Sequence, residues 1–203
     1  MMSCILLSAG LSSRFGSHKA LARLEKIPLI EHLQKMLISS KVSEIVVVLG
    51  ASFEEIEPHI FKHEKIVCVR NPDYRLGQIS SFKTGLKNVS ANSLAALLLP
   101  VDYPLIKTET IDTLCDFFLA RRPSIVIPTY QNRKGHPPIF HKKLTKQLLE
   151  WDASIGLNRF AEQMKPQTIL SPVEDPGILL TFNTPAEFAE LKKIYENEKS
   201  LDR

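Results

Sequence analysis

The sequence predicts an α/β protein, with one three-layer α/β/α domain built around a doubly wound, mostly parallel sheet of the Rossmann-like kind. Two observations carry this prediction. Continuous apolar runs typical of buried parallel strands occur at residues 4–7, 44–50 and 66–69. Segments with helical periodicity lie between them, so strand and helix alternate twice in the first third of the chain, as they do in doubly wound sheets.

The length and composition fit one globular domain. At 203 residues, with 44% hydrophobic and 24% charged residues, the chain is long enough to bury a core, and the domain is expected to span residues 1–203. The tail after about residue 196, rich in Glu, Lys and Asp, is expected to fray.

Charge and cysteine usage indicate the compartment and the partners. The formal net charge is +4, but Lys and Arg are scattered, so we expect no nucleic-acid partner; the same basic balance suits a polyphosphate substrate. Cys4, Cys68 and Cys115 are odd in number and lie in apolar runs, which predicts buried reduced thiols and a cytoplasmic location. The longest apolar run, residues 94–99, is too short to cross a bilayer, and we expect no membrane association.

The loop after the first strand has the composition of a phosphate cradle. Small residues let backbone N–H groups approach phosphate oxygens, while Arg14 and Lys19 supply positive charge. The spacing is neither that of the Walker loop nor that of the dinucleotide fingerprint, and an ordinary strand-to-helix turn stays open as the alternative. The candidate nucleotide-binding residues here are Ser8, Ala9, Gly10, Leu11, Ser12, Ser13, Arg14, Gly16 and Lys19.

The next elements follow from periodicity and turn chemistry. An amphipathic helix is predicted to begin near Pro28, and the strand at residues 44–50 should be buried on both faces. Ser52 and Glu55 have the spacing of a helix capping box. Turn residues at 71–77 precede a helix predicted over residues 78–89. The 71–77 loop either closes over a ligand or is a surface connection.

A lone carboxylate follows the strand predicted at residues 94–99. Asp102 stands between Pro100 and Pro104, which fix the backbone, so it should project from the carboxyl end of the sheet beside the first loop. A carboxylate suits Mg²⁺, which takes one or two of them and completes its shell with phosphate oxygens and water. The alternative is an Asp that only forms a turn.

The second half of the chain adds a helix after Thr108, a strand at residues 124–128 and a polar hairpin between Tyr130 and Phe140 that contains His136. A solvated turn is the plain interpretation of this hairpin. A helix start is predicted further on, because Thr184, Pro185 and Glu187 combine the cap, first-turn proline and acidic residue of a capping box. The core face of that helix should carry Phe188, Leu191 and Ile194.

Several motifs resemble those of the molybdenum cofactor nucleotidyltransferases, which share a glycosyltransferase-A-like NTP transferase fold. The sequence Leu-Ser-Ala-Gly-Leu-Ser-Ser-Arg-Phe-Gly-Ser-His-Lys at residues 7–19 is similar to the family's Leu-Ala-Ala-Gly-x-Ser-x-Arg-Met-Gly-x-x-Lys. Residues 71–86 resemble its Asn-Pro…Gly-x-x-x-Ser-Leu…Gly-Leu segment, Leu-x-x-Asp-x-Pro recurs around Asp102, and Gly-His-Pro recurs at residues 135–137. The single glycine after Ala9 resembles the cytidylyl-transferring branch more than the guanylyl branch.

The resemblance assigns roles to individual residues. It implies that Arg14 and the loop amides hold the β- and γ-phosphates, that Lys19 holds the α-phosphate, and that Asp102 binds Mg²⁺; these three are the candidate catalytic residues. Gly77 and Ser81 would contact the nucleobase and ribose. His136 would face the acceptor substrate as a binding or structural residue, without acting as a base.

The chain departs from the cytidylyl branch near its C-terminus. Thr181 and Asn183 stand where that branch usually has two aspartates, and Asn183 matches the guanylyl branch's Asn-Thr-Pro. Asn183 is therefore a second candidate metal ligand, through a neutral oxygen or a water. Losing both carboxylates puts the metal affinity and the base preference in question.

The resemblance implies transfer of a nucleoside monophosphate from an NTP, CTP before GTP, to a phosphorylated acceptor with release of pyrophosphate. Molybdopterin is the first expected acceptor, a sugar or polyol phosphate the alternative, and a recipient molybdoenzyme an expected protein partner. A different class of function is a non-catalytic carrier that holds a phosphorylated cofactor and passes it on. The two are distinguished by pyrophosphate release.

Overall fold

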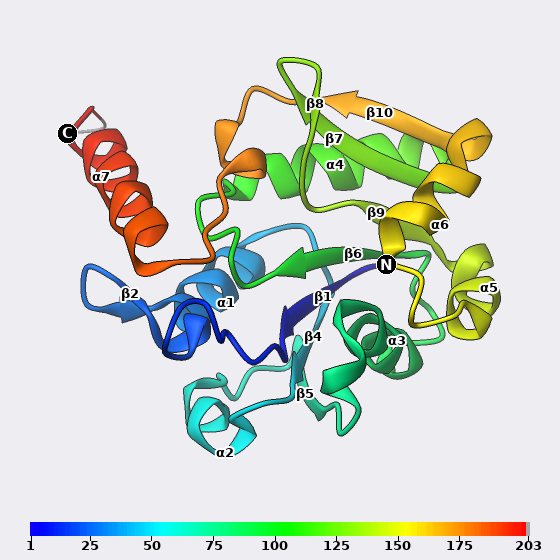
Figure 1. Ribbon diagram of the computed structural model, residues 1–203. Coiled ribbons are helices and arrows are strands. Elements are labelled where there is room, and N and C mark those ends of the chain that lie inside the picture. The colour runs from blue at the N-terminus through cyan, green and yellow to red at the C-terminus, as the bar shows by residue number, and fades with distance from the viewer. Residues whose placement is uncertain (202–203) are drawn as a thin grey trace.

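A mostly parallel sheet forms the centre of the protein in the computed structural model, which describes residues 1–201. The strands run in the order β10-β7-β9-β6-β1-β4-β5, with β8 paired to β7 (Figure 1). The main strands are β1 (Met2–Ser8), β4 (Glu44–Leu49), β5 (Ile66–Arg70), β6 (Ala95–Pro100), β7 (Ile125–Tyr130), β8 (Arg133–Lys134), β9 (Ile139–His141) and β10 (Thr168–Pro172). The expected doubly wound α/β class is confirmed.

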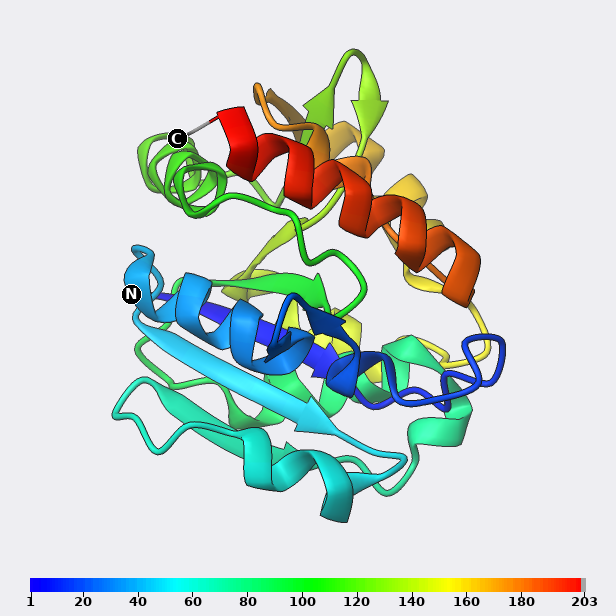
Figure 2. The same ribbon diagram turned by 90° about the vertical axis from the view of Figure 1, so that its left-hand side faces the viewer.

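The helices cover both faces of this sheet. They are α1 (Leu29–Ser39), α2 (Phe53–Ile56), α3 (Gln78–Asn88), α4 (Thr108–Arg121), α5 (Thr145–Glu150), α6 (Leu157–Gln163) and α7 (Pro185–Leu201). One apolar cluster joins alternate strand residues to α1, α4 and α7, and a second joins the intervening strand residues to α3, α5 and α6. The period-2 alternation of strand side chains thus builds the two cores of a three-layer domain. Figure 2 shows α1 and α7, blue and red, on the same side of the molecule.

The centre of the sheet is the most strongly buried part of the chain. β1 lies parallel between β4 and β6, and all residues of β1 and β6 are buried. Gly85 of α3 lies so close to β1 that an added Cβ would come within 2.4 Å of the Ile5 side chain. A larger residue at position 85 would therefore separate the helix from the strand that leads into the first loop.

Two antiparallel strands interrupt the parallel order. β9 lies between β6 and β7 and runs antiparallel to both, and β8 forms a short hairpin with β7. The polar hairpin expected between Tyr130 and Phe140 therefore folds back into the sheet. A two-stranded ribbon, β2 (Arg23–Leu24) with β3 (Ile27–Pro28), precedes α1.

Two local expectations differ from the structure. Ser52 is left-handed (φ 60°) and its hydroxyl contacts His18 Nε2 at 3.0 Å, so it makes no capping box with Glu55. The prediction that Ile194 faces the core is wrong, since it is 36% exposed, whereas Phe188 and Leu191 are buried as expected. Helix α7 continues to Leu201, and Lys199 pairs with Glu25 on the ribbon turn at 2.7 Å; the expected fraying after about residue 196 stays a prediction. Residues 202–203 of that tail lie outside the described residues.

The structure shows the burial of the three cysteines and the distribution of charge on the surface. Cys4 and Cys115 are buried, Cys68 is half-buried, and all three are free thiols. Burial raises the pKa of Cys68 to about 11 and that of Cys115 to about 12, which keeps these thiols protonated at neutral pH.

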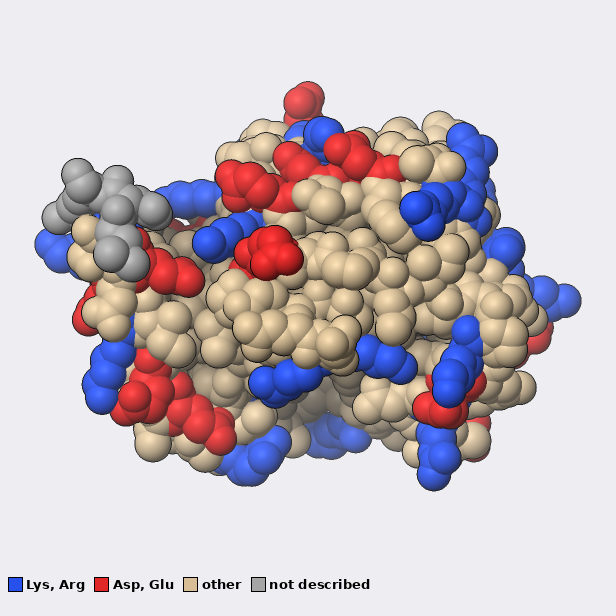
Figure 3. Space-filling model, turned by 90° about the horizontal axis from the view of Figure 1, so that it is seen from above, with Lys and Arg blue, Asp and Glu red and all other residues tan. Residues whose placement is uncertain are grey.

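On the face seen from above in Figure 3, basic and acidic side chains are interspersed. Within residues 1–201, no helix combines the length and the hydrophobicity needed to cross a membrane.

Candidate active site

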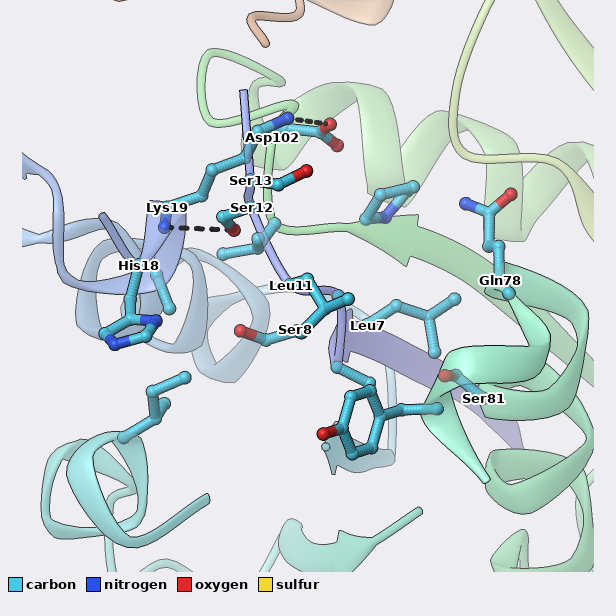
Figure 4. A pocket seen from close by; sticks show the side chains of 18 of the residues that line it. Leu7, Ser8, Leu11, Ser12, Ser13, His18, Lys19, Gln78, Ser81 and Asp102 are labelled. Atoms are coloured by element: carbon cyan, nitrogen blue, oxygen red, sulfur yellow. Dashed lines mark hydrogen bonds and ion pairs between the residues drawn. The ribbon is translucent and has the colours of Figure 1, made fainter. Parts of the chain in front are cut away.

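A cavity of about 410 Å³ opens beside the carboxyl ends of β1 and β6. Its walls come from the loop after β1, the segment before and at the start of α3, the turn after β6 and the segment before α7 (Figure 4). Of the residues expected to bind nucleotide or metal, those that line it are Ser8, Ala9, Gly10, Leu11, Ser12, Ser13, Arg14, Lys19, Gly77, Ser81, Asp102 and Asn183. A volume of this size is typical of small-ligand sites.

The loop after β1 keeps its shape through its own backbone. Ser12 has a left-handed backbone conformation (φ 52°). Its carbonyl oxygen accepts hydrogen bonds from the N–H groups of Phe15, at 2.9 Å, and Gly16, at 3.2 Å. Gly16 has φ 80°, a conformation that glycine adopts without strain. Gly16 is not among the cavity-lining residues, and its N–H donates within this turn, so in this structure it shapes the loop; its expected nucleotide contact stays a prediction.

Phe15 anchors this loop to the C-terminal helix. It is buried, and its ring packs edge-on against Phe182 at 5.2 Å and Phe188 at 5.7 Å between centroids. The segment before α7 is thereby held against the loop, although more than 160 residues separate them in sequence. This contact explains how Asn183 comes to lie in the cavity wall beside Arg14.

Lys19 and Asp102 meet at the centre of the cavity wall. Lys19 Nζ lies 2.8 Å from Asp102 Oδ2, and both side chains are largely buried, at 11% and 22% exposure (Figure 4). The Lys19 ammonium also donates to the Phe182 carbonyl at 2.5 Å and to Asn183 Oδ1 at 3.1 Å. Arg14 Nη2 donates to the same Asn183 oxygen at 3.0 Å. The two candidate phosphate-binding cations and the two candidate metal ligands thus form one connected group.

The oxygen donors of this group fit a magnesium ion in type and number. Asp102 supplies one carboxylate and Asn183 one amide oxygen, and both oxygens lie within 3.1 Å of the same ammonium nitrogen. Mg²⁺ is commonly bound by one or two carboxylates, with substrate phosphates and water completing its shell. Among the described residues, no three His, Cys, Asp or Glu side chains gather as a metal-binding group.

The opposite wall is shaped by Asn71, which follows β5. Its Nδ2 donates to Ser80 Oγ at 3.0 Å and Ser81 Oγ at 2.9 Å, and its Oδ1 accepts from Asp73 N at 3.0 Å. Gly77, with φ 91°, then turns the chain into α3. The buried Ser81 hydroxyl accepts from Asn71 and faces the cavity, which leaves its own proton for a ligand.

Several lining residues were not predicted. His18, Ile56, Tyr74, Arg75 and Gln78 all border the cavity. For His18 the neighbouring Lys19 gave a signal, and for Tyr74, Arg75 and Gln78 the nearby Gly77 did, because residues that flank a binding loop tend to share its surface. Ile56, at the end of α2, had no such neighbour. His18 Nε2 also lies 3.1 Å from the Glu55 carboxylate, a contact between segments that no local pattern marks.

His136 lies apart from the cavity lining. Its ring stacks on Tyr103 at 4.3 Å between centroids, and its backbone N–H donates to the Ile178 carbonyl. Burial lowers the pKa of His136, and the nearby Asp102 carboxylate offsets part of this effect. Burial, and then Asp102, raise the pKa of Tyr103. The structure therefore stacks His136 on Tyr103, near the Asp102 carboxylate, and neither ring is among the residues that line the cavity.

Comparison with known proteins identifies the family. The sequence model of the MobA-like NTP transferase domain matches residues 4–168. The molybdenum cofactor cytidylyltransferase of Escherichia coli is 25% identical over 194 residues, covering 96% of this chain and 97% of the relative. A probable molybdenum cofactor guanylyltransferase of Bacillus cereus is 28% identical over 202 residues, with the same coverage.

Solved structures share the fold. A nucleotidyl transferase from Methanothermobacter superposes with a TM-score of 0.81 at 20% identity and covers 98% of this chain and 99% of its own. Molybdopterin-guanine dinucleotide biosynthesis protein A from Archaeoglobus fulgidus gives 0.70 at 16% identity, covering 96% of this chain and 99% of its own. The chain belongs to the family of MobA-like NTP transferase domains, and it is a nucleotidyltransferase of that family.

Proposed function

We propose that this protein transfers a nucleoside monophosphate from an NTP, with CTP first, to a phosphorylated acceptor, molybdopterin first, and releases pyrophosphate. One observation carries the proposal. Lys19, Arg14 and Asp102 line one cavity together with a loop of small residues, so that two cations border the space proposed for a polyphosphate. Such a site supplies the charge neutralisation that phosphorus-centred transfer needs.

The chemistry needs alignment more than proton transfer. An oxygen of the acceptor's phosphate forms a bond to the α-phosphorus, and the bond from that phosphorus to the β-phosphate oxygen breaks as pyrophosphate departs. The attacking phosphate is already anionic, so no general base has to remove a proton. His136 is half-buried, stacks on Tyr103 and does not line the cavity, and the proposed chemistry assigns it no proton transfer.

Each basic residue has a position suited to one part of the triphosphate. Lys19, beside Asp102 at the end of the loop, would neutralise the α-phosphate, where negative charge grows during the transfer. Arg14, nearer the start of α7, would bind the β- and γ-phosphates together with the loop amides. Gly77 and Ser81 on the facing wall would contact the nucleobase and ribose.

Asp102, with Asn183 beside it, would hold a magnesium ion. When bound, that ion would supply positive charge to the phosphate oxygens of the nucleotide. The neutral Asn183 contributes less charge than the aspartate of the cytidylyl branch, so Asp102 carries most of the electrostatic attraction.

The choice of CTP over GTP rests on the first loop. The loop has Ala9-Gly10, with the single glycine of the cytidylyl branch, whereas Asn183 matches the guanylyl branch. Relatives carry both names, at 25% and 28% identity. CTP therefore comes first and GTP second, and a sugar phosphate follows molybdopterin as acceptor. A molybdoenzyme that receives the finished dinucleotide would be the protein partner.

The test is pyrophosphate release from CTP, GTP, ATP and UTP with magnesium, each with and without molybdopterin or a sugar phosphate. The proposal predicts release that depends on the acceptor and is fastest with CTP and molybdopterin. If release were fastest with GTP, only the proposed nucleobase would change, and the proposed reaction would stand. Tight nucleotide binding with no release in any combination would contradict the proposal and favour a carrier of a phosphorylated cofactor.

A further inference from the structure

The ammonium group of Lys19 is saturated by the protein itself. It donates to Asp102 Oδ2, the Phe182 carbonyl and Asn183 Oδ1, at 2.8, 2.5 and 3.1 Å. A lysine has three N–H donors, so these bonds use all of them. Lys19 can therefore bind a phosphate only by releasing at least one of these oxygens.

The three oxygens resemble the ligand set of a hard divalent cation. One is a carboxylate, one an amide oxygen and one a backbone carbonyl, and they converge on a single point from two segments of the chain, the turn after β6 and the segment before α7. Oxygen ligands of these types are the ones that Mg²⁺ and Ca²⁺ use. The point at their centre is occupied by the Lys19 nitrogen, whose side chain is only 11% exposed.

Occupation by Lys19 and binding of a divalent ion exclude each other. The oxygens that would bind the ion are the acceptors of the three lysine bonds, and a divalent charge placed beside an ammonium in a largely buried site meets strong repulsion. Arg14 differs from Lys19 here, since it contacts one of the three groups, the Asn183 amide oxygen.

We propose that Lys19 occupies the divalent-cation site of the free protein, through Asp102, Phe182 and Asn183, and vacates it when a triphosphate draws the ammonium away. The metal then binds with or after the nucleotide and not before it. This inference rests on the proposed function in one respect, because the triphosphate is the ligand that attracts Lys19. It makes Lys19 a residue that sets the order of binding as well as one that neutralises phosphate charge.

The test is Mn²⁺ binding to the nucleotide-free protein, measured by the electron paramagnetic resonance signal of free Mn²⁺. Lys19→Met removes the ammonium and keeps an unbranched side chain of similar length beside Phe182. It is expected to bind one Mn²⁺ at least roughly tenfold more tightly than the wild type. The gain should disappear when Asp102→Asn is added, since the carboxylate is the main ligand.

Arg14→Met is the matched control, because it removes the same charge from the same cavity and frees only one of the three groups. It should change Mn²⁺ affinity far less than Lys19→Met. Circular dichroism and thermal unfolding report whether each variant is folded, and Lys19→Gln replaces Lys19→Met if that variant unfolds.

Two results would overturn the inference: Mn²⁺ binding by the nucleotide-free wild type as tight as that of the Lys19 variant, or equal gains in the Lys19 and Arg14 variants. Neither result bears on pyrophosphate release by the wild type, which tests the proposed function separately. Likewise, if the wild type released no pyrophosphate, the Mn²⁺ affinities of the wild type and the variants would still test this inference.

Discussion

Lys19 and Asp102 are the two residues on which the proposed chemistry depends most directly. Their side chains meet at 2.8 Å in the cavity wall. In the proposal, Lys19 would supply the charge for the α-phosphate and Asp102 would bind the metal. We predict that Lys19→Ala and Asp102→Ala each lower turnover by at least about 100-fold, because each removes charge stabilisation of the transition state. Steady-state pyrophosphate release measures the effect.

Lys193→Ala is a suitable control for these variants. Lys193 pairs with Glu190 on the exposed face of α7, with 66% of its side chain accessible, and should have an unchanged rate. Near-normal turnover in either the Lys19 or the Asp102 variant, with the fold intact, would remove that residue from the catalytic assignment.

His136 gives a prediction for stability at acid pH. Burial lowers its pKa, so the folded protein binds fewer protons at this ring than the unfolded chain does. The stability that depends on the neutral ring is present above the ordinary histidine pKa of about 6.5 and is lost as the pH falls through the lowered value. Urea unfolding at about pH 7.5 and about pH 5.5 should show the wild type less stable at the lower pH.

His136→Phe keeps a ring beside Tyr103 and removes the titration. The stability difference between the two pH values should therefore be smaller in this variant than in the wild type. An equal difference in both proteins would show that protonation of His136 does not destabilise the fold.

At the residue level, the sequence is informative where one short segment carries both the strand and the site. Lys19 and Asp102 could be placed because each follows a buried strand whose carboxyl end faces the same edge of the sheet. The contact of Lys19 with Asn183 could not be predicted, since it depends on how Phe15 packs under Phe182 and Phe188. Tertiary packing of this kind has no local pattern.

Helix α7 is the element that completes the site. Its start is fixed by Thr184, whose Oγ1 accepts the Glu187 N–H at 3.2 Å, while the Glu187 carboxylate accepts the N–H groups of Asn183 and Thr184. These bonds hold Asn183 directly before the helix. We predict that Thr184→Ala destabilises the fold by about 1 kcal/mol, the usual effect of losing a helix cap. Urea unfolding monitored by circular dichroism measures it.

Thr113→Ala on the exposed face of α4 is the matched control for this cap. Thr113 bonds only to the Glu109 carbonyl within its own helix, and alanine favours helix at such a position, so no loss of stability is expected. Equal destabilisation by both substitutions would contradict the capping role of Thr184.

Most elements follow from sequence periodicity, and those that do not are short. The strands at the sheet centre and helix α3 lie within a residue or two of their expected bounds, and helices α1 and α4 begin within a residue or two of their expected starts. β9 spans three residues and inserts antiparallel between β6 and β7, which a three-residue pattern cannot specify. Ser52 has the letters of a capping box, but its hydroxyl bonds to His18 instead.

At the scale of the whole molecule, the sheet and its layers decide where the site forms. β1, β4 and β6 are parallel neighbours, so the loops that follow them meet at one edge of the sheet. α7 then packs on the same side as α1 and α4 and brings the segment before it to that edge (Figure 2). The doubly wound arrangement was predictable from alternating strands and helices. The position of α7 beside the cavity was not predictable in this way, because it depends on the packing of Phe15 against Phe182 and Phe188, which lie far apart in the sequence.

The most direct test of nucleotidyl transfer follows the phosphates of the nucleotide separately. CTP and GTP labelled at the α- or the γ-phosphate are incubated with the wild-type protein, magnesium and molybdopterin, and the products are separated. We predict that the α-label enters the acceptor and that the γ-label leaves entirely as pyrophosphate, in equal amounts. Transfer of the γ-label to the acceptor, or its release as inorganic phosphate without acceptor labelling, would contradict this prediction.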